Sequence, residues 1–218
     1  MNQLASLRNV LESEAAALIG SSRAVFLLAY SQRFAMLFEL FEQRVANPVA
    51  KFEAVLSELW SLASGVEPSS RARENLAAII PGEDWVVDGF YDAIAQYVGG
   101  LAIGALEGMN GDGQIAGNPE QGIFDLIRLL LSEMRLGCTE PGEDAEGVAF
   151  DSEIHNERLV IEEEEFWRRI LKALVQPYRI DEIRRLAFDN VIDPESLEPD
   201  LSEGLARDDG GDGGPTPG

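Results

Sequence analysis

The stretch SRAVFLLAYSQRFAMLFELFEQRV, which runs from Ser22 to Val45, decides the fold of this chain. Its apolar side chains recur every three or four residues, a spacing that puts them on one face of an α-helix. They are Phe26, Leu27, Tyr30, Phe34, Leu37, Phe38, Phe41 and Val45. A stripe this broad is typical of a helix with one buried side, and the turn at Asn47-Pro48 ends the pattern. We therefore predict one long helix that starts after Ser21 or Ser22 and continues to Val45.

The same period recurs on both sides of this segment as far as Phe188. Further helices are predicted at residues 3–19, from Phe52 to the helix-ending Gly65, at 71–79, 84–107, 118–135 and 152–175, and in a short last segment that ends near Asn190. No useful length of sequence alternates with the period of a β-strand, and no internal repeat is present. The predicted fold is all-α, a single-domain multi-helix bundle of about seven to eight helices over residues 1–192.

Residues 193–218 differ from the rest of the chain in composition. From Asp193 onward there are eight acidic residues and a single arginine, and glycine and proline increase toward the end. Such a segment cannot bury enough apolar surface to offset the entropy lost on ordering. We predict a disordered, acidic, Gly/Pro-rich tail.

Two glycines, Gly100 and Gly104, lie four residues apart in the predicted helix 84–107. This spacing lets helices approach closely. It also occurs in membrane helices, but the uncharged run Ala93–Leu106 has 14 residues, which is too short to span a bilayer. The N-terminus lacks the pattern of a signal peptide. We therefore expect helix packing inside a cytoplasmic protein, without a membrane.

The charge of the chain limits its partners. It has 39 acidic and 17 basic residues and a formal net charge of −22. An acidic surface repels nucleic-acid backbones and anionic membranes and attracts a basic protein instead. The alternative is that the charge only keeps the surface solvated. Oligomeric state stays open.

One histidine and one cysteine exclude zinc sites built on several such ligands, and also a disulfide within the chain. No nucleotide-binding glycine motif, nucleophile elbow or HExxH is present. His155 could share a helical face with Asp151 or Glu162 and bind a metal, but a solvated or capping histidine is favoured because the paired Glu-x-x-His pattern is absent. We predict no catalytic residues, cofactor or metal.

Glu163 is the acidic residue that the pattern places on an apolar stripe, between Leu159 or Val160 and Phe166 or Trp167. A buried carboxylate needs a partner, and Arg33 borders the buried face of the helix at 22–45. We predict a structural ion pair between them. The alternative is a ligand or catalytic pocket around Arg33, Glu163 and Tyr91.

Three stretches of the chain carry a family resemblance. They are IPGEDWVVDGFYDAI at residues 80–94, Gln32-Arg33 with Phe38 and Phe41, and residues 56–62 with Trp60. Together they resemble the YjaG-like family of uncharacterised bacterial helical proteins, as a distant match over residues 26–174. The resemblance implies a cytoplasmic, all-helical protein and brings no activity with it.

Two functions remain open. The first is a non-enzymatic interaction module whose acidic surface binds a basic partner, in an inhibitory or immunity-like role. The second is a small-molecule or metal-binding enzyme that uses carboxylates within the bundle. Because only Glu163 is placed on an inner face, we favour the first function over the enzyme.

Overall fold

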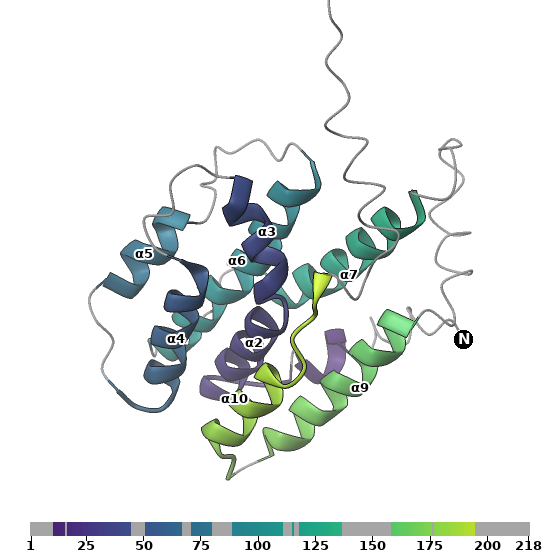
Figure 1. Cartoon of the computed structure of the whole chain (residues 1–218). Helices are drawn as coiled ribbons and strands as arrows, with labels where there is room; N and C mark the ends of the chain where they lie inside the picture. The colour runs from purple at the N-terminus through teal and green to yellow at the C-terminus, as the bar shows by residue number, and fades with distance from the viewer. Residues whose placement is uncertain are drawn as a thin grey trace, which may run out of the picture.

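The computed structural model describes residues 11–15, 17–44, 51–66, 71–79, 89–110, 115, 118–136, 158–175 and 177–194. All regular structure in these ranges is helical, which confirms the all-α prediction (Figure 1). The segments are η1 (Leu11–Ala15), α2 (Ser21–Arg33), α3 (Ala35–Arg44), α4 (Phe52–Ala63), α5 (Arg71–Ile79), α6 (Phe90–Met109), α7 (Pro119–Leu136), α9 (Arg158–Ala173) and α10 (Ile180–Phe188).

Several predicted boundaries fall outside these ranges. Of the helix predicted at 3–19, the described part is the short π-helix η1, and residues 17–19 are not helical. The beginnings of the helices predicted at 84–107 and 152–175 lie outside the described residues, as does the tail beyond Pro194. Ile192 is 6% exposed and belongs to the core.

The single helix predicted from Ser22 to Val45 is wrong, because the chain breaks at Phe34. Helices α2 and α3 meet there at an angle of 58°. In a continuous helix the Leu37 amide would donate to the Arg33 carbonyl. Here Leu37 donates to the Phe34 carbonyl, and the Arg33 carbonyl accepts from the amide of Ile192 at 2.8 Å. A contact from the far end of the chain thus replaces the local hydrogen bond.

The break leaves the apolar stripe buried throughout. Every residue of α2 from Ala24 to Arg33 is buried, and α2 contacts α3, α4, α6, α7, α9 and α10 (Figure 1). Helix α3 turns onto α6 and α4, where Phe38 stacks on Phe52 with ring centroids 4.1 Å apart. Phe34 is itself buried and belongs to the same apolar pattern, so the spacing of apolar residues does not reveal the break.

The described helices also bear on membrane spanning by their length and composition. No single helix among them is both long and apolar enough to cross a bilayer, and α2 with α3 would reach that length and composition only as a bent pair.

The close helix approach predicted at Gly100 and Gly104 occurs instead at Gly104 and Gly108. A Cβ atom at Gly104 would lie 3.0 Å from Cδ1 of Leu27, and one at Gly108 would lie 2.9 Å from Cβ of Ala24. A Cβ atom at Gly100 would meet no heavy atom within 4 Å. Helices α2 and α6 therefore pack most tightly along the second pair of glycines.

We expect opposite effects from alanine at two of these positions. Gly100→Ala should stabilise the fold by about 0.5–1 kcal/mol, because alanine favours a helix and has space there. Gly108→Ala should destabilise it by about 1–3 kcal/mol, because the methyl group overpacks the contact with Ala24. Urea denaturation of both variants measures the difference. Equal stability of the two would show that α2 and α6 do not approach as closely as described.

Candidate functional site

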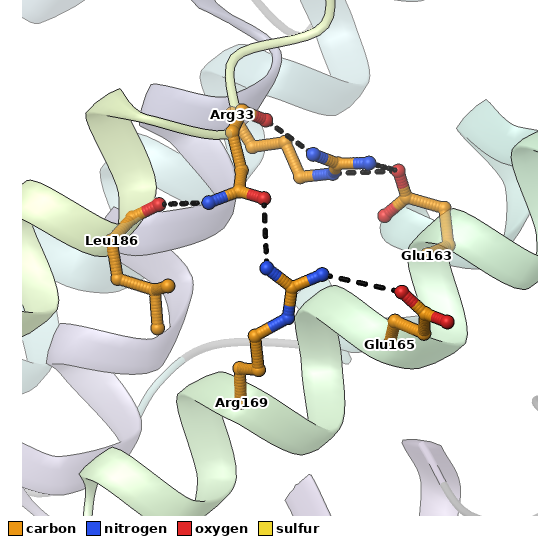
Figure 2. Close-up of polar contacts among 6 residues, drawn as sticks. Arg33, Glu163, Glu165, Arg169 and Leu186 are labelled. Atoms are coloured by element: carbon orange, nitrogen blue, oxygen red, sulfur yellow. Dashed lines mark hydrogen bonds and ion pairs between the residues drawn. The ribbon is translucent and has the colours of Figure 1, made fainter.

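The predicted contact between Arg33 and Glu163 is present in the structure. Arg33 lies at the end of α2, and its Nε donates to Oε1 of Glu163 on α9 at 2.6 Å (Figure 2). Its Nη2 contacts the same oxygen. Both residues are buried, with Arg33 4% and Glu163 0% exposed. The pair therefore joins two helices that are distant in sequence through an ionic contact inside the bundle.

Arg33 also holds the segment that follows α10. Its Nη1 donates to the backbone carbonyl of Asn190, and its own carbonyl accepts from Ile192. The side chain of Asn190 donates to the carbonyl of Leu186 at 2.8 Å and accepts from Arg169 at 3.4 Å. Figure 2 shows the hydrogen bonds of the Arg33 and Arg169 side chains and the one to the carbonyl of Leu186. One arginine thus connects α2, α9 and the chain after α10.

The surroundings of the pair are mainly aromatic. The guanidinium carbon of Arg33 lies 4.5 Å from the ring centroid of Phe166, which meets Tyr30 edge-on at 5.2 Å. Burial raises the pKa of Glu163, and the charge of Arg33 opposes that shift without cancelling it. Burial also raises the pKa of Tyr30, and the charge of Glu163 adds to this effect. The environment disfavours a net negative charge.

Two buried polar atoms have no hydrogen-bond partner in the part of the chain that is described. They are Oε2 of Glu163 and Nε1 of Trp167, four residues apart on α9.

Because the pair of Arg33 and Glu163 is closed off from solvent, an external substrate has no direct access to the carboxylate. The arrangement fits the structural ion pair predicted from the sequence and offers no exposed acid or base for catalysis.

Tyr91 lies beside an arginine other than Arg33. It is half-buried at the start of α6, and the guanidinium of Arg44 lies 3.7 Å from its ring centroid. Arg44 ends α3, one whole helix beyond Arg33. The break at Phe34 and the direction of α6 place Tyr91 beside α3. The structure thus brings together Arg33 and Glu163 and puts Tyr91 elsewhere.

In the described ranges, no group of three or more His, Cys, Asp or Glu side chains could hold a metal ion. Glu162 is exposed on α9, while His155 and Asp151 lie outside the described residues. In the run of four glutamates, only Glu163 turns fully inward. Its neighbours Glu164 and Glu165 pair with Arg168 and Arg169 on the same helix.

An open groove between α6 and α7 is a feature that the sequence did not predict as a site. Its volume is ≈ 420 Å³. The lining residues are Gln96, Tyr97, Gly100, Ile103, Gly104, Glu107, Asn118, Pro119, Gln121, Gly122 and Asp125. Two of them, Glu107 and Asp125, are acidic, and none is a basic residue. The sequence indicates Gly100 and a helix from residue 118, but their juxtaposition depends on how α6 and α7 pack.

The groove is lined by both polar and apolar groups. Gln121 donates to Oδ1 of Asp125 at 2.9 Å. The pKa of Tyr97 is raised by partial burial and then by the negative charge of Asp125. Ile103 is 36% exposed at the groove. A ligand there would meet acidic and amide groups beside an apolar surface.

No known protein family, no curated protein and no solved structure matches this chain. The resemblance to the YjaG-like family stays a prediction.

A double-mutant cycle measures the coupling between Arg33 and Glu163. Arg33→Ala should destabilise the fold by about 3–5 kcal/mol, because it leaves a buried carboxylate without its counter-ion. Glu163→Ala should have a similar effect, and the double variant should lose less than the sum of the two. Chemical denaturation gives the three values. Additive losses would contradict the contact.

The pH dependence of stability should report the raised pKa of Glu163. A carboxyl group with a raised pKa binds its proton more tightly in the folded state, so it favours folding at low pH. That contribution is lost as the pH rises through the Glu163 pKa. The stability of the parent relative to Glu163→Gln should therefore fall between pH 4 and pH 7. If the parent instead becomes more stable relative to Glu163→Gln as the pH rises over this range, the charge of Arg33 outweighs burial in setting the pKa of Glu163.

Proposed function

We propose that this chain is a non-enzymatic interaction module that binds a basic protein partner. The observation that carries the proposal is its surplus of acid: the formal net charge is −22. Even if every basic residue paired with one acidic residue, a surplus of that size would have no counter-ion in the chain. Such a charge attracts a basic surface at long range and raises the rate of association.

Ion pairs within the fold neutralise basic side chains together with an equal number of acidic ones, so the charges left unpaired are more predominantly acidic. Arg23 binds Glu120 through two hydrogen bonds, of 2.5 and 2.7 Å. Arg33, Arg168 and Arg169 also pair within the fold. These arginines are engaged by the bundle itself. An inhibitory or immunity-like role, in which the acidic module covers a basic surface of its partner, is one form this binding could take.

The enzyme alternative requires several carboxylates that converge where a substrate can reach them. Glu163, the acid placed on an inner face, is instead closed off beside Arg33, and the open α6–α7 groove has two carboxylates in its lining, Glu107 and Asp125. The interaction module requires no such convergence. A single thiol suits the reducing cytoplasm, where we expect the module to act.

Salt dependence tests the proposed function. The immobilised full chain is exposed to a lysate of the cells that produce it, at low and at high salt, and bound proteins are identified by mass spectrometry. We expect a basic partner whose measured affinity, after purification, falls as salt rises, because exposed charges are screened beyond about 8 Å at 0.15 M. A specific partner that is acidic, is a nucleic acid, or binds equally in high salt would contradict the proposal.

A further inference from the structure

The groove between α6 and α7 has the shape to receive a side chain. Gln96, Gly100 and Gly104 lie at intervals of four residues and so share one face of α6. Gly100 carries no side chain, and the space above it is empty of heavy atoms to 4 Å from an added Cβ. Gly122 faces the groove from α7, where the nearest atom to an added Cβ is Cδ1 of Tyr97 at 3.6 Å. Two glycines thus keep the groove open.

The chemistry of the lining selects a cation. Glu107 and Asp125 contribute negative charge, Gln96, Asn118 and Gln121 contribute amide oxygens, and none of the lining residues is basic. Ile103 and Pro119 add apolar surface along the same groove. Lysine and arginine combine a charged head with an apolar stem, so either could place its stem on this surface and its head near the carboxylates.

The ring of Tyr97 favours arginine over lysine. A guanidinium is planar, donates in two parallel hydrogen bonds to a carboxylate and stacks on an aromatic face. Asp125 and Tyr97 both line the groove, and the charge of Asp125 raises the pKa of Tyr97. Elsewhere this bundle already binds arginine in both ways: Arg23 forms its two hydrogen bonds to Glu120 at the start of α7, and Arg44 lies over Tyr91.

We propose that the α6–α7 groove binds an arginine side chain of the basic partner. The inference rests on the proposed function and adds to it the place and the chemistry of recognition. Charge complementarity is the argument for this occupant, and the open space at Gly100 is the reason it can enter.

The experiment uses Nα-acetyl-arginine amide as the probe and the full chain labelled with ¹⁵N. Titration followed by amide chemical shifts should move signals of α6 and α7 around Tyr97, Gly100 and Asp125. The citrulline analogue has nearly the same shape without the charge and should bind at least about fivefold more weakly, the effect of an ion pair of about 1 kcal/mol. The lysine analogue should also bind more weakly, because it cannot form two parallel hydrogen bonds.

Three variants locate the binding. Asp125→Asn removes one charge from the groove and should weaken the arginine probe by about fivefold. Gly100→Met fills the groove from a position with free space and should abolish binding while the thermal melt stays that of a folded bundle. Glu39→Gln removes the same charge from an exposed position on α3 and should leave the affinity unchanged.

Equal binding of the citrulline or lysine analogue, shifts confined to other helices, or full binding by Gly100→Met would overturn the inference. Any of these results would leave the salt-dependent binding of a basic partner standing. Conversely, a partner that is not basic would remove the proposed function even if the arginine probe bound in the groove. The two failures are therefore distinguishable.

Discussion

The burial of one charged pair at the end of α2 constrains the whole arrangement. Removing a guanidinium and a carboxylate from water costs several kcal/mol for each ion, so the pair persists only where its geometry and hydrogen bonds are nearly complete. Arg33 meets this demand with Glu163 on one side and the carbonyl of Asn190 on the other, while Oε2 of Glu163 stays without a hydrogen bond in the described residues. Few placements of α9 and α10 satisfy both contacts at once. The pair therefore determines where α9 and α10 lie at least as much as it stabilises the fold.

Local pattern was enough to predict the parts of the structure that depend on local periodicity. Helices α4, α5 and α7 follow from apolar spacing and end signals, and the charged residues within two apolar stripes indicate that Arg33 and Glu163 meet. The break at Phe34 has no such signal, because it is completed by an amide 158 residues later in the sequence. Tyr91 was misplaced for the same reason: its neighbour is set by the direction of α3 after the break.

The groove shows a second limit of sequence patterns. Gly100 and Gly104 are equivalent by spacing, yet the first faces open space and the second is pressed against Leu27. Only the packing of α2 and α7 around α6 distinguishes them. The acid surplus is visible in composition, whereas the place where two carboxylates and a tyrosine ring meet an open groove is a property of the folded bundle.

The hydrogen bond from Ile192 to Arg33 also bears on how the chain folds during synthesis. Residues near the N-terminus leave the ribosome first, but the bend between α2 and α3 is completed by one of the last residues of the bundle. Contacts of such long sequence separation close slowly, because the entropy of a large loop is lost before the contact forms. The bend between α2 and α3, and the part of α2 that α9 and α10 cover, therefore stay incomplete until translation has passed residue 192. Such exposed apolar surface is what chaperones protect.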